Sequence, residues 1–323
     1  MGRRYFIAGG AGFIGSHFVD RLLSDSNSEV LTIFDNFSSG RQWHYESHAS
    51  DPRLRVVGGD IKDFSALRSA LEGHCTVIHL ASNPDIARAA TEPDIDFREG
   101  TYLTNQILEA MRFCRVKTII YASGSGVYGD VGSLEVDEDY APMRPISTYG
   151  ASKLAGEALI SSYCHMFGLR GLCFRFANVV GPRQTHGVVF DFIRKLLKDD
   201  SRLEILGDGS QSKSYIAVSD VVSAVMSALD LSGDNFDVYN VATDDYISVL
   251  EIADLTLGVV LPGCEVDYVF SGGDRGWRGD VPVVRLDTAR IKNLGWRASM
   301  NTREALRGSA EAILADFKAG RIS

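Results

Sequence analysis

The sequence has no run of apolar residues long enough for a transmembrane helix and no excess of positive charge. Its 323 residues carry 33 Lys+Arg against 42 Asp+Glu, which gives a formal net charge of -9. A helix needs about 18 consecutive apolar residues to cross a bilayer, and a broad basic surface is needed to bind phosphate backbones or anionic lipid. We therefore expect no membrane and no nucleic acid among the partners.

Cysteine is scarce, and its spacing forms no motif. The five cysteines are an odd set without a C-x-x-C pair, so neither a disulfide framework nor a zinc knuckle is indicated. The start, Met1-Gly2-Arg3-Arg4, leads directly into a strand-like stretch, which does not fit a signal peptide. We expect a protein of the reducing cytoplasm.

Short apolar segments alternate with helical patterns through the first half of the chain. Strands are expected at residues 4–8, 30–34, 54–57, 77–81, 118–122 and 171–174. Continuously apolar strands indicate a sheet that is covered on both faces, and alternation with helices requires parallel crossovers. The fold class is therefore α/β, a Rossmann-type doubly wound parallel sheet.

The alternation breaks after Asn178, where glycine and proline punctuate the chain. We expect a dinucleotide-binding domain over residues 1–178 and a smaller mixed α/β substrate lobe over 179–323, with helices at 188–198 and 220–229. A strand near 236–241 is expected to return to the first sheet.

A glycine-rich turn follows the first expected strand. Gly9, Gly12 and Gly15 have the G-x-x-G-x-x-G spacing and precede a helical pattern. Glycines there allow a pyrophosphate to approach backbone N–H groups and the helix N-terminus. Asp35 ends the second strand twenty residues after Gly15, where a carboxylate can accept both ribose hydroxyls and repel a 2'-phosphate. This favours NAD over NADP, although the nearby Arg41 weakens the preference. Asp60, after the third strand, is a candidate for the adenine.

Tyr149 and Lys153 lie four residues apart, on one face of an expected helix. A lysine in this position lowers the pKa of the phenol, so that the phenolate can act as a base near neutral pH. Alone the pair is more typical of a solvated helix face, but behind a dinucleotide-binding turn it indicates a catalytic pair.

The chain resembles the extended short-chain dehydrogenase/reductase family of NAD-dependent nucleotide-sugar epimerases and dehydratases, and is UDP-glucose 4-epimerase-like. The resemblance spans nearly the whole length and rests on the glycine-rich turn, the Tyr149/Lys153 pair and these segments: His79-Leu80-Ala81-Ser82, Gly100-Thr101, Ser123-Gly124-Ser125-Gly126-Val127-Tyr128-Gly129, Arg175-Phe176-Ala177-Asn178-Val179-Val180-Gly181-Pro182 and Arg278-Gly279-Asp280. It implies that Tyr149 is the catalytic base, that Lys153 contacts the nicotinamide ribose, and that a 4-keto sugar forms transiently.

The resemblance also implies the remaining binding residues. For NAD it adds Phe13, Ile14, Asn36, Ser38, Ser39, Gly40, Ile61, Leu80, Ala81, Ser82 and Ala177. For the nucleotide sugar it implies Asn83, Ser125, Tyr149, Asn178, His186, Val188, Val189, Lys213, Tyr215, Arg278 and Asp280, with Arg275 as an alternative to Arg278. Phe190 and Phe192 are either a wall for the base or core residues. Val284 stands where a bulky residue in relatives restricts the C2 substituent of the sugar, so its small side chain implies tolerance for N-acetyl sugars.

Departures from the family pattern decide among its activities. Dehydratases carry Thr-Asp-Glu, and decarboxylases keep a glutamate, where this chain has Gly124-Ser125-Gly126. This favours 4-epimerisation of a UDP-hexose, with dehydration or decarboxylation as the alternative. Gly124 replaces the usual hydroxyl residue, so Ser125, or less favourably Ser123, is expected to supply it; a non-catalytic NAD-binding or nucleotide-sugar-binding protein is the alternative of another class. Phe97 replaces a frequent asparagine.

Two further interpretations concern metals and assembly. His44 and His48 would form a metal pair only on a helix, and a surface loop is the favoured interpretation, so no metal site is predicted. The helices around 103–111 and 154–161 are predicted to form the interface of a homodimer, as in relatives, unless they are core.

Overall fold

The computed structural model describes residues 2–322, in two compact units. The first unit contains residues 2–127, 147–175 and 225–239, and the second contains 128–146, 176–224 and 240–322. The chain thus passes between the units several times, and residues 128–146 group with the second unit. A single boundary at residue 178 does not describe this exchange.

The first unit is built on a seven-stranded sheet with the order β12-β7-β5-β4-β1-β2-β3. The pairs β1/β2, β2/β3, β1/β4 and β4/β5 are parallel. The predicted doubly wound α/β class is confirmed. The strands are β1 (Arg3–Ala8), β2 (Ser28–Asp35), β3 (Leu54–Gly58), β4 (Thr76–His79), β5 (Thr118–Gly124), β7 (Arg170–Phe176) and β12 (Phe236–Val241).

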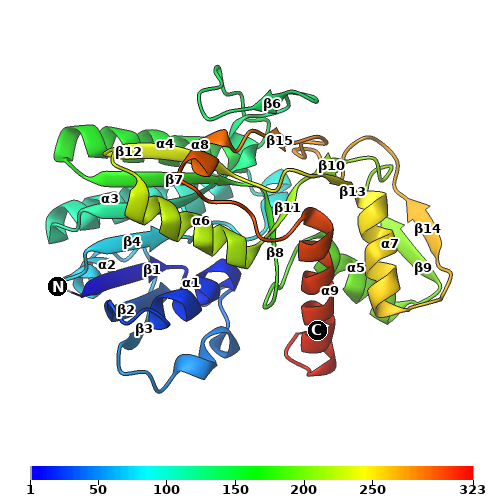
Figure 1. The fold of residues 1–323 in the computed structure, drawn as a ribbon, viewed down its shortest axis with the longest axis horizontal. Coiled ribbons are helices and arrows are strands. Elements are labelled where there is room, and N and C mark those ends of the chain that lie inside the picture. The colour runs from blue at the N-terminus through cyan, green and yellow to red at the C-terminus, as the bar shows by residue number, and fades with distance from the viewer. Residues whose placement is uncertain (1, 323) are drawn as a thin grey trace. The chain divides into compact units, whose positions relative to one another are not determined.

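Helices cover both faces of this sheet (Figure 1). One face packs against α2 (Phe64–Leu71), α3 (Tyr102–Cys114) and α4 (Thr148–Phe167). The opposite face carries α1 (Phe13–Leu23) and the end of α6 (Val218–Leu231). Burial on both faces explains why the central strands are apolar at successive positions, since Tyr5, Phe6 and Ile7 are all fully buried.

The second unit combines three longer helices with short two-stranded sheets. Its helices are α5 (Val188–Lys198), α7 (Val249–Val260) and α9 (Thr302–Lys318), with the short α8 (Ala289–Asn293). Capping boxes at Ser248/Glu251 and Asn301/Glu304 start α7 and α9. The paired strands are β8 (Asn178–Val180) with β11 (Tyr215–Ala217), β9 (Arg202–Ile205) with β14 (Asp267–Phe270), β10 (Ser212–Lys213) with β13 (Ile247–Ser248), and β6 (Glu135–Val136) with β15 (Arg285–Leu286).

Across residues 2–322, every helix is too short or too polar to span a bilayer.

Candidate functional site

The glycine-rich turn between β1 and α1 has no room for side chains. Gly9 has a φ of +81°, and a Cβ there would lie 2.8 Å from the Ala81 backbone nitrogen. A Cβ on Gly15 would lie 2.5 Å from the carbonyl oxygen of Gly9. These close approaches bring the turn against the chain that follows β4, where Leu80 and Ala81 both donate to the carbonyl of Ala8. The result is a bare backbone at the start of α1, as a pyrophosphate requires.

Asp35, the last residue of β2, holds the glycine-rich turn by a hydrogen bond from the turn's backbone. Its Oδ2 accepts a hydrogen bond from the Ala11 N–H at 3.0 Å, and its Oδ1 accepts one from the Phe37 N–H at 2.8 Å. Gly40 lies so close that a Cβ would stand 2.8 Å from Asp35 Oδ1. Burial raises the pKa of this carboxyl, and the two backbone hydrogen bonds oppose the rise. Each carboxylate oxygen keeps a second acceptor site for a ribose hydroxyl.

His44 also holds the backbone of the glycine-rich turn, a role that the sequence does not predict. Its Nδ1 lies 2.7 Å from the carbonyl oxygen of Ala11, which also accepts the N–H of Arg41. His48 faces elsewhere and pairs with Asp20 at 2.8 Å. Each histidine ends a separate short 3-10 turn, so the two have different partners.

The other predicted NAD residues belong to the first unit, except Ala177. Phe13 and Ile61 are buried, Asn36 accepts the Ser38 N–H, and Asp60 accepts the Lys62 N–H. Ile14, Ser39 and Ser82 are partly exposed. Ala177 groups with the second unit, where it is buried and donates to the carbonyl of Val241.

The helix α4 carries the predicted chemistry. Ser147 starts it, since its side chain accepts the Gly150 N–H. Lys153 is only 4% exposed, and its Nζ donates to the carbonyl of Ala122 at 2.7 Å. The ammonium lies 5.4 Å from the Tyr149 ring centroid and 5.1 Å from that of Tyr121. Burial lowers the pKa of Lys153 to about 8, although the negative charges of Asp96 and Glu157 act to raise it.

The pKa of Tyr149 departs from the sequence-based expectation. Burial raises it to about 12, Asp96 adds to the rise, and a side-chain hydrogen bond with Ser82 opposes it. The net lowering of this pKa that the Tyr149/Lys153 spacing predicts is not seen, because desolvation of the phenolate is the largest effect. The phenol is protonated at neutral pH.

The two candidate serines beside Gly124 differ sharply. Ser123 is 5% exposed, and its hydroxyl donates to Glu157 Oε1 at 2.5 Å. Ser125 is partly exposed, and its side chain has no hydrogen bond to any other residue in the part of the chain that the structure describes. A Cβ on Gly124 would meet nothing within 4 Å. Ser123 therefore serves the interior, whereas the space at Gly124 and the hydroxyl of Ser125 are available.

Buried carboxylates near the pair were also missed by sequence analysis. Glu157 is one turn after Lys153 on the same helix face, and that spacing is the signal that could have identified it. It pairs with Arg175 at 2.8 Å, with both side chains buried. Asp96 lies directly before the π-helical turn Phe97–Thr101 that leads into α3, where the 3.6-residue periodicity of an α-helix gives no signal.

Several residues predicted to bind substrate lie in the second unit with charged partners. Lys213 Nζ and Asp280 Oδ1 are 2.5 Å apart. Arg275 pairs with Asp130 at 2.6 Å and donates to the Asp280 carbonyl. Arg278 is exposed and makes no hydrogen bond or ion pair with another residue of the described chain. Arg278 is thus the cation of this group that is available for an anionic ligand.

Other predicted substrate residues are committed to packing. Val189 is 1% exposed and packs in the core of the second unit with Phe192. Phe190 stacks on Phe317 with ring centroids 5.4 Å apart. Asn83 is buried, and its side chain bonds Asp96 and the backbone of Asp85. Tyr215 is also buried, whereas Asn178, Val188 and Val284 are partly exposed and His186 is exposed.

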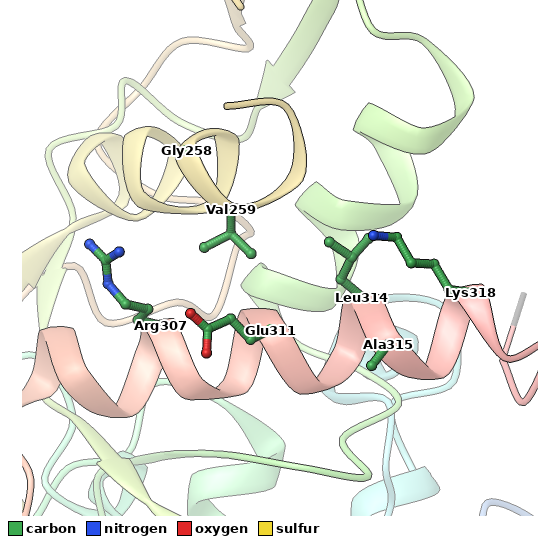
Figure 2. A pocket seen from close by; sticks show the side chains of 7 residues that line it. All are labelled: Gly258, Val259, Arg307, Glu311, Leu314, Ala315 and Lys318. Carbon is green, nitrogen blue, oxygen red and sulfur yellow. The ribbon is translucent and has the colours of Figure 1, made fainter. Parts of the chain in front are cut away.

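A groove between α7 and α9 is a further cavity of the second unit, with a volume of about 360 Å³ (Figure 2). Its lining is Gly258, Val259, Arg307, Glu311, Leu314, Ala315 and Lys318. None of these seven is among the predicted site residues. Figure 2 shows the acidic Glu311 between the basic Arg307 and Lys318 along α9.

Comparisons with known proteins identify the family and agree with the fold. The model of the NAD dependent epimerase/dehydratase family matches residues 5–242. UDP-glucose 4-epimerase of Mycolicibacterium smegmatis is 32% identical over 95% of this chain and 97% of its own length. A solved UDP-galactose 4-epimerase is 36% identical with a TM-score of 0.85, covering 97% of this chain and 99% of its own. The dTDP-glucose 4,6-dehydratase DesIV of Streptomyces venezuelae, solved as a double mutant with NAD, is 25% identical with a TM-score of 0.89, covering 98% of both chains.

Proposed function

The chain belongs to the NAD dependent epimerase/dehydratase family, and we propose that it is a 4-epimerase of a nucleotide-diphosphate sugar, with a UDP-hexose as its preferred substrate. The carrying observation is the placement of Lys153 beside Tyr149 on α4, with the ammonium held by the carbonyl of Ala122 at the end of β5. The same strand leads to Gly124-Ser125-Gly126, where a dehydratase would need an acid and a base.

NAD fits the residues of the first unit. The bare turn at Gly9, Gly12 and Gly15 suits the pyrophosphate, and the buried Asp35 carboxylate suits the adenosine ribose. NAD, when bound, supplies a hydride acceptor that can return the hydride to the sugar. The protein must hold the reacting carbon and manage the hydroxyl proton.

Tyr149 is the group that we assign to that proton. Its pKa of about 12 keeps the phenol protonated at neutral pH, so base function requires positive charge nearby. Lys153 contributes to that charge because its pKa of about 8 leaves the ammonium charged at pH 7, but the ammonium alone does not bring the pKa of the phenol to neutral pH. We assign the hydrogen bond to the sugar hydroxyl to Ser125, because Ser123 is held by Glu157.

The second unit supplies the groups that we assign to the nucleotide diphosphate. Arg278 is exposed and has a planar guanidinium suited to paired bonds with phosphate oxygens. Lys213 is neutralised by Asp280, so it contributes only when Asp280 turns to another donor, such as a ribose hydroxyl.

A 4,6-dehydratase is the second candidate, favoured by the likeness to DesIV. Against it, Ser125 and Gly126 stand where a dehydratase carries the acid and the base for elimination of water, and neither has a carboxylate; the missing glutamate at Gly126 also weighs against a decarboxylase. The absence of a hydroxyl at Gly124 instead favours, as an alternative of another class, a protein that binds NAD and a nucleotide sugar without turnover.

The enzyme is proposed to act in the cytoplasm as a homodimer. All five cysteines are free thiols, which suits a reducing compartment. Tyr102 and Phe113 of α3, with Met166 and Phe167 of α4, are exposed apolar side chains that an interface would cover. A monomer in sedimentation at micromolar concentration would refute the dimer.

The experiment is to incubate the purified protein with UDP-glucose, UDP-N-acetylglucosamine and UDP-glucuronate, and with TDP and GDP counterparts, and to follow each by NMR. Inversion at C4 without change in mass supports the proposal. A 6-deoxy-4-keto or a pentose product replaces it with dehydration or decarboxylation. Binding without any product supports the non-catalytic alternative.

A further inference from the structure

Asp96 is a buried carboxylate that joins two segments around the catalytic tyrosine. It is 1% exposed and precedes the π-helical turn Phe97–Thr101. Its Oδ1 accepts a hydrogen bond from Asn83 Nδ2 at 2.9 Å, and its Oδ2 accepts one from Thr148 Oγ1 at 2.6 Å. Asn83 follows β4, and Thr148 is the first residue of α4, directly before Tyr149. One side chain therefore holds the start of the catalytic helix against the loop after β4.

Both donors are neutral, so neither of these contacts compensates the negative charge of Asp96. Among residues 2–322, no Lys, Arg or His side chain forms an ion pair with it. A buried carboxylate in this situation acts strongly on charges around it, because little water screens the field. Its charge acts on both Tyr149 and Lys153. Structure alone would be served equally well by a neutral amide, which can accept from Asn83 and donate to Thr148.

The remaining charged and titratable groups around the pair are few. On α4 they are Lys153 and Glu157; on β5 the Tyr121 phenol, whose pKa burial raises; and on β4 His79, whose pKa burial lowers to about 3. Ser82, after β4, is the hydroxyl partner of Tyr149. The neutral His79 and Tyr121 contribute no charge at pH 7, and Glu157 is paired with Arg175. Asp96 is the carboxylate whose charge reaches Tyr149 without a cation bound to it.

We propose that Asp96 is a positioning residue for Tyr149: its carboxylate fixes the first turn of α4 against the loop after β4, and its buried charge sets the pH at which the phenol exchanges its proton. The negative charge adds to the effect of burial in keeping the phenol protonated, and it favours the charged form of Lys153. The inference rests on the proposed role of Tyr149 as the base.

The test compares Asp96→Asn with two controls. Asp96→Asn keeps both hydrogen bonds and removes the charge. Asp94→Asn removes a surface carboxylate two residues away that pairs with Arg98, and Thr148→Val removes one hydrogen bond but keeps the charge. The tyrosine signal is followed by NMR on protein labelled at the phenol carbon, with the Tyr149 resonance assigned by its loss in Tyr149→Phe. This readout needs no turnover, so it decides the electrostatic part of the inference even when no sugar is a substrate.

In Asp96→Asn the Tyr149 resonance is expected to titrate at a pH lower by roughly one unit, and the acid limb of the kcat profile is expected to move in the same direction. Asp94→Asn should titrate like the unmodified protein. Thr148→Val should lower kcat several-fold without moving the pH profile. If Asp96→Asn fails to fold, Asp96→Ser is the second neutral variant. Superimposable titrations of a neutral variant and the unmodified protein would overturn the electrostatic role, and unchanged kcat in Thr148→Val would overturn the positioning role.

Discussion

The Ser123 hydroxyl donates to Glu157 Oε1 at 2.5 Å, and Glu157 in turn is bound by the buried Arg175. This relationship ties the end of β5 to the middle of α4 and to β7 within the first unit. It also removes Ser123 from the candidates for contact with a ligand, because a charge-assisted hydrogen bond inside the protein would have to break first. Ser125, two residues later, has no such bond.

The two serines should therefore respond differently to alanine. We expect Ser125→Ala to lower kcat by at least roughly tenfold with little change in stability, because it removes a hydrogen bond to the reacting hydroxyl. Ser123→Ala should lower the free energy of unfolding by about 2 kcal/mol, since Glu157 loses a donor, and should spare kcat. Steady-state kinetics and denaturant unfolding measure both effects. Full activity in Ser125→Ala would reject the assignment.

Gly124 offers a gain-of-function counterpart. A Cβ there meets nothing within 4 Å, so Gly124→Ser should change the free energy of unfolding by less than about 0.5 kcal/mol. If a hydroxyl at this place serves turnover, Gly124→Ser should raise kcat several-fold and should restore activity to Ser125→Ala. Gly129→Ser is the contrasting control, because Gly129 has a φ of +78° and a Cβ would lie 1.9 Å from the Arg144 carbonyl oxygen; that variant should be strongly destabilised. A kcat unchanged by Gly124→Ser would argue against a missing hydroxyl.

Much of the first unit could be predicted because its sheet is buried on both faces. Residues 4–8, 30–34 and 118–122 are runs of mostly apolar residues without strict alternation, and each lies in a strand of the structure. Glycine spacing predicted the turn for a comparable reason, since Gly9 and Gly15 tolerate no side chain. Both signals are local, and the tertiary structure preserves them.

The parts that could not be predicted depend on partners distant in sequence. The sequence does not decide between Ser123 and Ser125 as the hydroxyl that contacts the sugar. They are distinguished by Glu157 on α4, which binds the hydroxyl of Ser123. The resemblance predicts that Val189 binds the substrate, but the face of α5 that carries it packs into the core of the second unit. The pKa of Tyr149 depends on burial and on Asp96, which spacing along one helix does not reveal.

His44 is expected to control NAD affinity through Ala11. Its Nδ1 lies 2.7 Å from the Ala11 carbonyl oxygen, and Asp35 holds the N–H of the same residue. His44→Phe removes that hydrogen bond within a buried site, so the Kd for NAD should rise by roughly five- to tenfold, equivalent to about 1 kcal/mol. Isothermal titration calorimetry on cofactor-stripped protein measures it. His48→Gln, which loses only a partly exposed pair with Asp20, is the control; equal affinities for all three proteins would contradict the prediction.

Arg278 is expected to govern the affinity for the nucleotide sugar. Arg278→Gln keeps a polar side chain but loses the charge, so the Kd for UDP should rise roughly tenfold or more while the Kd for NAD is unchanged. Arg194→Gln is the matched control in the second unit, because Arg194 is exposed and pairs with Asp191. Calorimetry with UDP and with NAD separates the two sites. Loss of affinity for both ligands would show a general structural effect instead.

Lys153 is expected to be required for activity and, at the same time, to lower the free energy of unfolding. Burial lowers its pKa from 10.5 to about 8, so the folded state disfavours the charged form, and this cost applies fully below pH 8. The shift corresponds to about 3 kcal/mol, offset by about 1 kcal/mol for the hydrogen bond to Ala122. Lys153→Met should thus be inactive yet more stable by about 2 kcal/mol at pH 7.

This advantage of the variant should shrink as the pH rises from 8 to 10.5. In that range Lys153 is already neutral in the native protein, while the unfolded chain still binds the proton. The native protein therefore gains stability relative to the variant. Urea unfolding at pH 7, 8, 9 and 10 measures this difference, and Lys198→Met, a surface lysine at the end of α5, should show none. An advantage that grew with pH would mean that the buried ammonium is not the source of the cost.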